Sequence, residues 1–250
     1  MKRTVSLGIA ALLLLCGASA LSAFSFEPIT RDFSPSGKDS IRTFRLANSA
    51  SDTIMIRIRI LTREVDSDGR EVNDPADSLF TIYPSRVVLA PRSLQAVKVQ
   101  WKGPPDLQVE RCFRILAEQL PVRSAEEHRQ GGNIRVMFRY LGAIYVVPKG
   151  ARPNVVVEST RSVTDPSGRK GLEILFCNQG NAHTLLNNLQ ITLSRQQAGA
   201  SARKVYEPDE LEGINGENLL PGLKRRTVVP LPVDLQGDGL DVSFHFESVR

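Results

Sequence analysis

The sequence is poor in the residues that disulfide-held and metal-dependent proteins use. Its 250 residues include only three cysteines, three histidines and one tryptophan. A disulfide scaffold is therefore not needed to account for its stability. His128, His183 and His245 fall in separate segments, and we interpret them as loop and strand-face residues.

Motifs of enzyme and metal chemistry are also missing. There is no G-x-S-x-G elbow, no Walker loop and no G-x-G-x-x-G. The stretch "DSDGRE", residues 66–71, has the acids of a calcium loop but not its ligand spacing, so an Asp-Gly hairpin turn is predicted. Cys177 and His183 flank "NQGNA", but two ligands do not make a four-ligand site. We predict no enzyme activity, no metal and no cofactor.

The one long apolar run lies at the start of the chain. Positive residues precede "LGIAALLLLCG", and small residues follow it, which is the pattern of a signal peptide over residues 1–23. Cleavage is expected after Ala20 or Ala23. A lipoprotein is disfavoured because Leu15, before Cys16, is large. The mature chain is therefore expected to be exported.

Charge gives little support for nucleic acid as a partner. The whole chain carries a net charge of +5, and the chain without residues 1–23 has 30 basic and 27 acidic side chains. The basic residues are scattered among acids. Two cysteines remain, Cys112 and Cys177, both in apolar strand-like runs. Two buried free thiols are predicted over a bridge between them.

Short apolar runs alternate with turn residues along the rest of the chain. This rhythm is typical of all-β sandwiches, and no stretch has the pattern of a long amphipathic helix. The segment "PKGARPN", residues 148–154, interrupts the rhythm with two prolines and a glycine and is a candidate linker. We predict a β-sandwich domain over residues 24–148 and a second, smaller β-sandwich domain over residues 149–250.

The stretch "NIRVMFRYLGAIYVVP", residues 133–148, predicts one strand with two environments. In its first half Ile134, Val136 and Phe138 alternate with Arg135, Met137 and Arg139. In its second half the sequence becomes almost continuously apolar, which indicates burial on both faces. The first half could therefore present a regular apolar row to a binding partner outside the protein's own core. The alternative is that it is an ordinary sandwich strand.

Several stretches resemble one family, the periplasmic pilus chaperones of the PapD type. "ERCFRILAEQLP" is similar to the family's F strand, "FTIYPSRVVLAPRSLQAVKVQW" to the stretch before it, and "PITRDF" to its first strand. The strand over residues 133–148 ends in the family's usual proline, Pro148. "GLEILFCNQGNAHTLL" and "LLPGLKRRTVVPLP" resemble the C-terminal domain more loosely.

This resemblance implies a fold, a partner and a mechanism. Two immunoglobulin-like β-sandwich domains would form an L. The protein would act in the periplasm, bind pilus or fimbrial subunits that lack one strand, and deliver them to an outer-membrane usher. Ile134, Val136 and Phe138 would be the subunit-binding side chains that fill the open groove of the subunit.

The family also holds the C-terminal carboxylate of the subunit with an arginine and a lysine. Arg31 matches the arginine, but Ala143 stands where the lysine would be, and we predict that Arg139 substitutes for it. Glu110 matches a family acid that fixes the angle between domains, although its arginine partner is replaced by Val147. For Arg139, the alternative is a solvated strand-face residue.

Two other functions are compatible with the sequence. A secreted two-domain β-sandwich could serve as a structural or adhesive module without a client, and it would need neither the apolar row nor Arg31. A polysaccharide-acting enzyme would need a pair of carboxylates in a groove, and the sequence indicates no such pair.

Overall fold

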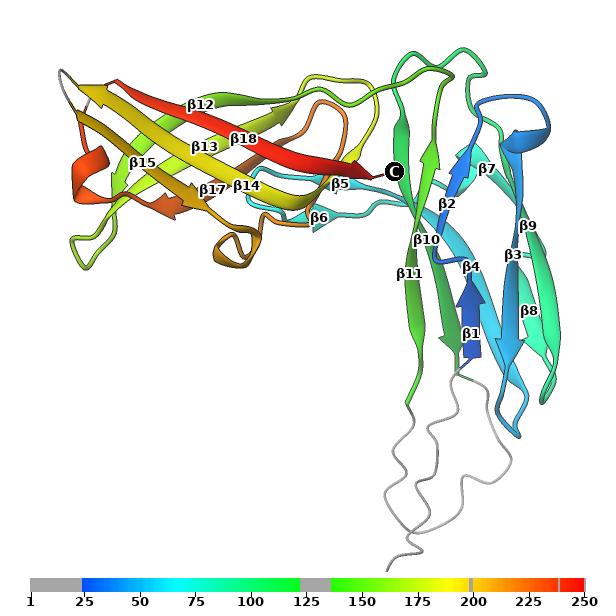
Figure 1. The fold of residues 1–250 in the computed structure, drawn as a ribbon. Coiled ribbons are helices and arrows are strands. Elements are labelled where there is room, and N and C mark those ends of the chain that lie inside the picture. Colours follow the sequence, from blue (N-terminus) through cyan, green and yellow to red (C-terminus); the bar gives the residue numbers. More distant parts are fainter. Residues whose placement is uncertain (1–23, 122–135, 198–199, 238, 250) are drawn as a thin grey trace, which may run out of the picture.

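The computed structural model describes residues 24–121, 136–197, 200–237 and 239–249. These residues form β-strands and short 3-10 helices, and none of their helices could cross a membrane. The strands make two sandwiches that meet at one corner and give the molecule an L shape (Figure 1). The all-β prediction with two sandwiches is therefore confirmed. The predicted signal peptide lies outside the described residues.

The first sandwich packs a four-stranded sheet against a five-stranded sheet. Its strands follow the alternation in the sequence: on β4 four isoleucines point into the core and the residues between them point outward. The four-stranded sheet has the order β1 (Phe24–Glu27), β3 (Ile41–Asn48), β9 (Leu94–Trp101), β7 (Phe80–Tyr83). The five-stranded sheet has the order β2 (Thr30–Phe33), β11 (Arg139–Val146), β10 (Arg111–Leu120), β4 (Ile54–Thr62), β8 (Arg86–Leu89). The helices η1 (Lys38–Ser40) and η2 (Asp77–Leu79) lie between its strands.

The first strand segment changes sheets after four residues. β1 pairs antiparallel with β3, the chain turns at Pro28, and β2 then pairs parallel with β11 in the opposite sheet. The pairing of β2 with β11 begins at Ala143, whose N–H donates to the Ile29 carbonyl. The earlier part of β11 is therefore not covered by β2.

β11 is shorter than the sequence predicts. The pattern indicates one strand from residue 133, but β11 begins at Arg139, and residues 136–138 are not in a strand. Residues 133–135 lie outside the described residues. The difference has a physical reason, because a strand needs a partner. β10 ends at Leu120, and among the described residues its last backbone hydrogen bond to this segment runs from the Gln119 N–H to the Phe138 carbonyl.

The second sandwich has its own core. Leu172, Ile174 and Phe176 on one sheet face Ile191 and Leu193 on the other, all nearly without exposure. One sheet has the order β12 (Val155–Thr164), β13 (Lys170–Asn178), β17 (Lys224–Pro230). In the other sheet β14 (Thr184–Gln197) pairs with β15 (Ala200–Tyr206), β16 (Asn218–Leu219) and β18 (Leu240–Val249). The helices are η3 (Pro208–Glu210) and η4 (Val233–Leu235). The division at residue 148 stays a prediction.

A hairpin of the first sandwich extends to the second. β5 (Glu64–Val65) and β6 (Glu71–Val72) are joined by the predicted Asp-Gly turn, in which Gly69 takes a positive φ of 83°. The Asp66 carboxylate accepts hydrogen bonds from the backbone N–H groups of Asp68 and Arg70. At the tip, the Ser67 carbonyl accepts a hydrogen bond of 2.8 Å from the Arg226 N–H on β17. The hairpin prediction is confirmed, and the hairpin also links the two sandwiches.

Candidate functional site: a free strand edge and a buried joint

The first half of the β11 segment has a free outer edge. Within the described residues, β2 covers β11 only from Ala143 to Val146, while β10 pairs with its inner side from Arg139 onward. Among the described residues, the outer backbone edge of residues 136–142 therefore has no strand partner. Such an edge is a template for β-strand addition.

The predicted apolar row runs from the core to this edge. Ile144 and Val146 are fully buried in the first core, Tyr140 and Phe138 pack against it, and Val136 is 52% exposed. Ile134 lies outside the described residues. The row thus continues the core-facing side of β11 beyond the point where the sandwich can bury it. We call residues 136–142 the donor edge.

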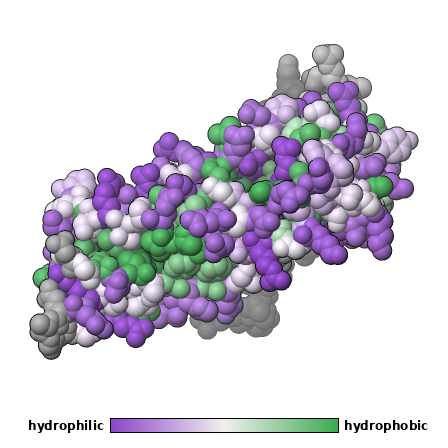
Figure 2. Space-filling model, turned by 90° about the horizontal axis from the view of Figure 1, so that it is seen from above, coloured by the Kyte–Doolittle hydropathy of each residue, from purple (hydrophilic) through white to green (hydrophobic). Residues whose placement is uncertain are grey.

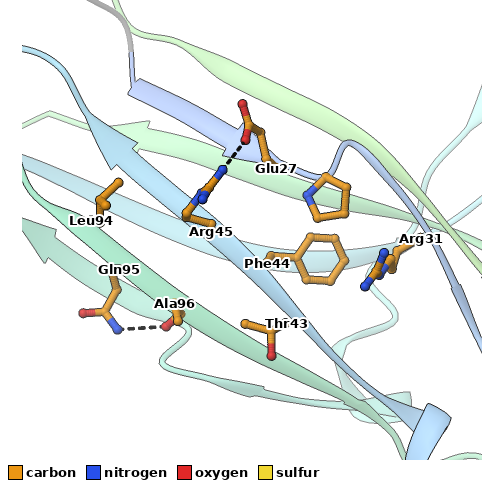
Figure 3. Close-up of a pocket in the computed structure, with 9 residues that line it drawn as sticks. Glu27, Arg31, Thr43, Phe44, Arg45, Leu94, Gln95 and Ala96 are labelled. Atoms are coloured by element: carbon orange, nitrogen blue, oxygen red, sulfur yellow. Dashed lines mark hydrogen bonds and ion pairs between the residues drawn. The ribbon is translucent and has the colours of Figure 1, made fainter.

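Arg31 lies on β2 with its side chain in an open pocket of the first sandwich. The pocket is formed where β1 turns into β2, Pro28 is one of its lining residues, and Figure 3 shows Arg31 beside Phe44. Arg45 lines the same pocket and donates to the Glu27 carboxylate at 2.8 Å. No hydrogen bond or ion pair to Arg31 is found among the described residues. Its guanidinium is therefore available to an anion.

Arg139 has a different setting. Its side chain is 67% exposed, and its Nε lies 3.8 Å from the Glu118 carboxylate, which also holds Arg57 at 2.6 Å. Arg31 pairs in register with Ile144, five residues further along β11, or about 16 Å at the usual rise of a strand. The structure therefore does not bring the two predicted anchor residues together.

A buried pair joins the two sandwiches. Glu110 precedes β10 in the first sandwich, and His183 precedes β14 in the second. His183 Nδ1 lies 2.6 Å from Glu110 Oε1, and the His183 N–H donates to Oε2 at 3.2 Å. The His183 side chain is 7% exposed and the Glu110 side chain is 0% exposed. His183 lies in the loop before β14, as predicted, but its ring is buried against Glu110 of the first sandwich, which the sequence did not indicate.

Tyr145 on β11 extends this contact. Its ring stacks on that of His183, with centroids 3.8 Å apart and planes 13° from parallel. Its hydroxyl accepts hydrogen bonds from Arg63 at 2.8 Å and from Asn218 at 2.6 Å. We call the set of Glu110, Tyr145 and His183 the joint. The joint connects the end of β11 that lies away from the donor edge to the second sandwich. Sequence reasoning missed the joint, although a family acid at Glu110 without its arginine partner was a signal that another residue had to neutralise it.

Next to the joint, two arginines hold Glu71. Arg114 Nε donates to Glu71 Oε1 at 2.6 Å, and Arg63 Nε donates to Oε2 at 3.2 Å. Burial alone would raise the pKa of Glu71, but hydrogen bonds and charge from Arg114 and Arg63 outweigh it and hold that pKa below its ordinary 4.5. Glu71 therefore stays ionised under neutral conditions and orients Arg63 toward Tyr145.

Replacing Glu71 with glutamine is expected to lower the free energy of unfolding by about 2 kcal/mol at neutral pH. The folded-state pKa is lower than the unfolded-state pKa, so the carboxylate stabilises the fold above about pH 4.5. This stabilisation is lost as the pH falls through the folded-state pKa. Urea unfolding across this range should therefore show the difference between wild type and variant shrinking in acid. Exposed Glu212→Gln is the control, and a difference that does not change with pH would contradict the prediction.

Both described cysteines are free thiols, as predicted. Cys177 is buried, and Cys112 is half-buried and donates to the Glu110 carboxylate at 3.2 Å. Burial and the Glu110 carboxylate raise the pKa of the Cys112 thiol, so it is unreactive. Among the described residues, no group of three His, Cys, Asp or Glu side chains could hold a metal ion.

Solved structures resemble this chain over most of its length. The CsuC–CsuE chaperone–tip adhesion subunit pre-assembly complex from archaic Csu pili of Acinetobacter baumannii gives a TM-score of 0.58 at 12% identity, over 89% of this chain and 98% of that chain. A chaperone–tip adhesin complex of CFA/I fimbriae biogenesis gives 0.54 at 16% identity, over 84% and 91%. CfaA, a class 5 fimbriae chaperone, gives 0.53 at 14% identity, over 90% and 100%.

The fold is that of the fimbrial chaperones. The fold expected from the resemblance in sequence is therefore confirmed. No protein-family model matches the sequence, and no curated protein matches it either. At 12–16% identity the likeness concerns the fold, and function has to be argued from the residues of this chain.

Proposed function

We propose that this protein is a periplasmic chaperone that binds incomplete pilus or fimbrial subunits by lending them a strand. The observation that carries the proposal is the donor edge, which has no strand partner on its outer side among the described residues and whose apolar row leaves the core at Val136. Main-chain hydrogen bonds would hold a subunit strand of almost any sequence, and the row would fill the groove that the subunit leaves open. The chaperones of similar fold in complexes with subunits support this assignment.

Binding through a donated strand also explains how a subunit could be released. A donor row that fits the groove imperfectly leaves apolar burial still to be gained. A better-fitting final strand from the next subunit could therefore replace the donor edge without an energy source. Delivery to an outer-membrane usher, and export through a signal peptide over residues 1–23, belong to the same proposal.

Arg31 is the proposed anchor for the C-terminal carboxylate of the subunit. Its guanidinium is unpaired among the described residues and lies in an open pocket (Figure 3). Arg139 is the proposed second cation, although it can take this role only by leaving Glu118, which keeps Arg57 as a partner. If Arg139→Ala leaves subunit binding unchanged, Arg139 has no part in the anchor.

The first experiment is to purify the tagged mature protein from its own host and identify what accompanies it by mass spectrometry. A small β-rich partner in a one-to-one ratio is expected. Arg31→Glu should reduce the amount of partner at least tenfold, because a charge-assisted hydrogen bond of about 1.5–3 kcal/mol becomes a repulsion. Arg86→Glu, an exposed change on β8, is the matched control. A partner that survives Arg31→Glu would place the anchor elsewhere, and no partner at all would favour a stand-alone structural or adhesive module.

A further inference from the structure

The second sandwich has an unpaired edge at its last strand. Within the part of the chain that the structure describes, β18 pairs with β14 and has no strand on its other side. β12, an outer strand of the facing sheet, runs along the same side of the domain (Figure 1). β18 has ten residues, so it leaves a long row of backbone groups without a strand partner. An edge of this kind is a template for another strand.

β18 lacks the features that usually protect an edge strand. Its sequence, LDVSFHFESV, contains no lysine and no proline. Its pairing with β14 is regular from Leu240 to His245, and the register shifts only between His245 and Glu247. β12 differs, because its pairing with β13 shifts register after Val157, within the strand. β18 is therefore left open to pairing with another chain.

Apolar side chains of β18 are left partly uncovered beside this edge. Along β18 exposed polar residues alternate with half-buried apolar residues that face the core. Their neighbours on β14, Ile191 and Leu193, are fully buried, so burial decreases toward the edge. Figure 2, which views the molecule from above, shows an apolar band bordered by polar side chains on the second domain. The apolar set on β18 consists of Leu240, Val242, Phe244 and Phe246.

The outward face of β18 carries an acid and an imidazole four residues apart. The acid is Asp241, the imidazole is His245, and Ser243 lies midway between them. All three side chains are exposed, and no side-chain hydrogen bond or ion pair of Asp241 or His245 is found among the described residues. Residues that lie opposite each other in an antiparallel pair have their side chains on the same face of the sheet. This face can therefore be matched by an identical strand that runs in the opposite direction.

We propose that β18 pairs antiparallel with β18 of a second copy of this chain, about a twofold axis at Ser243. In this register each Asp241 lies opposite His245 of the other copy, so an imidazole N–H can donate to the carboxylate. The contact forms twice, because a twofold interface uses the same surface on both copies. The sheet of each second sandwich thus continues into that of the other copy.

The apolar set supports the same register. With Ser243 opposite its copy, Val242 lies opposite Phe244, and Leu240 lies opposite Phe246. Every apolar side chain of the set therefore meets another apolar side chain, and pairs of an aromatic with a β-branched residue are favourable across strands. The second copy covers the row that β18 leaves half-buried.

Other registers fit less well. One centred on Phe244 would place two acids, Asp241 and Glu247, opposite each other. One centred on His245 would place the two imidazoles opposite each other. One centred on Phe246 would bring His245 to Glu247 but would leave the first residues of β18 without partners. The charges and the apolar set therefore agree only on the register centred on Ser243.

This contact does not involve the donor edge. In Figure 1 the lower end of β11, which carries the donor edge, points away from β18. A dimer through β18 would therefore leave the donor edge of each copy free to bind a client. The inference goes beyond the proposed function and does not rest on it, because it follows from β18 alone. One pair of strands buries less area than a standard interface, so we expect a reversible dimer with a micromolar dissociation constant.

Disulfide formation tests the register. Ser243→Cys, with oxidised glutathione as the oxidant, is expected to give a covalent dimer on gels without reductant. Opposite Cα atoms of an antiparallel pair lie about 4.5–5.5 Å apart, within the span of a disulfide. Glu247→Cys, on the same exposed face, is the matched control, because the two Glu247 positions would lie about 27 Å apart along the strands. No covalent dimer of Ser243→Cys, or equal amounts with both variants, would overturn the inference.

Sedimentation of the purified mature protein over a range of concentrations measures the dimer itself. The wild type is expected to dimerise. Ser243→Lys places two ammonium groups opposite each other and should raise the dissociation constant at least tenfold. Ser201→Lys makes the same change at an exposed position of β15, on the other side of β14, and should have no effect. A wild type that stays monomeric, or a Ser243→Lys variant that dimerises equally well, overturns the inference.

The donor edge provides the last control. Val136→Asp should dimerise as the wild type does, and loss of the dimer in this variant would overturn the inference by placing the contact at the donor edge. Ser243→Lys should bind the co-purified client as the wild type does, so a failure of the inference leaves the proposed function intact. Urea unfolding of β18 variants such as His245→Leu is measured well below the dissociation constant, where the chain is a monomer.

Discussion

Replacing His183 with leucine is expected to lower the free energy of unfolding by about 3 kcal/mol, the cost of leaving a buried carboxyl without its main hydrogen-bonding partner. The imidazole is the only side chain of the second sandwich that is hydrogen-bonded to the Glu110 carboxylate, among the described residues. Without it the carboxylate, which is 0% exposed, would stay buried with only the Cys112 thiol and a backbone N–H as donors. Unfolding in urea, followed by tryptophan fluorescence, measures the loss.

Two further variants test whether the pair itself is responsible. His183→Asn places an amide nitrogen near the position of Nδ1, so it should keep part of the stability although the stacking on Tyr145 is lost. Glu110→Leu combined with His183→Leu leaves no buried carboxyl without a partner and should be more stable than His183→Leu alone. His245→Leu, an exposed change on β18, is the control. A double variant as unstable as the sum of its single changes would contradict the buried pair.

The joint also relates stability to the geometry of binding. Tyr145 belongs to the strand that carries the donor edge, and its contacts to His183 and Asn218 cross to the second sandwich. The Ser67–Arg226 hydrogen bond makes a second connection at the hairpin tip. Two separate connections restrict rotation of one sandwich against the other, and this restriction orients the donor edge relative to the second domain. Small-angle scattering of His183→Leu should therefore show a broader distribution of shapes than the wild type.

Alternating patterns predicted the sandwiches well because burial on one face of a strand is a local property. The isoleucines of β4 and the Asp-Gly turn after β5 could be placed from the sequence alone. The start of β11 could not, because it depends on where the preceding strand, β10, ends as its pairing partner. A pattern of apolar residues shows which face is apolar, but it does not show whether a partner strand is present.

The partners of charged residues are even harder to predict from the sequence than the bounds of strands. Arg31 and Arg139 were both predicted as anchors, yet Arg31 has no ion-pair partner among the described residues and Arg139 lies near Glu118 on the neighbouring strand. The partner of Glu110 is 73 residues away, in the other sandwich. Ion pairs depend on which strands are neighbours, and this information is absent from any single stretch of sequence. Topology was therefore required to find the joint and to separate the two predicted anchors.

Val136→Asp is expected to weaken binding of the client by at least 100-fold. In the complex Val136 would be buried in the groove of the client, where a valine contributes about 1.5–3 kcal/mol and an unpaired carboxylate costs more than that. A loss of about 3 kcal/mol corresponds to a factor of more than 100 in affinity. Titration calorimetry with the client found by co-purification measures the change.

The free protein should tolerate this substitution, which makes the test selective. Val136 is 52% exposed and lies outside the regular pairing of β11. The melting temperature of the Val136→Asp variant should therefore stay close to that of the wild type. Val88→Asp is the matched control, since Val88 is 67% exposed on β8 and lies away from the donor edge. Equal binding by wild type and Val136→Asp would mean that the apolar row is an ordinary strand face. A loss of binding with both variants would point to a nonspecific effect of negative charge, and only a loss confined to Val136→Asp identifies the donor edge as the surface that completes the client.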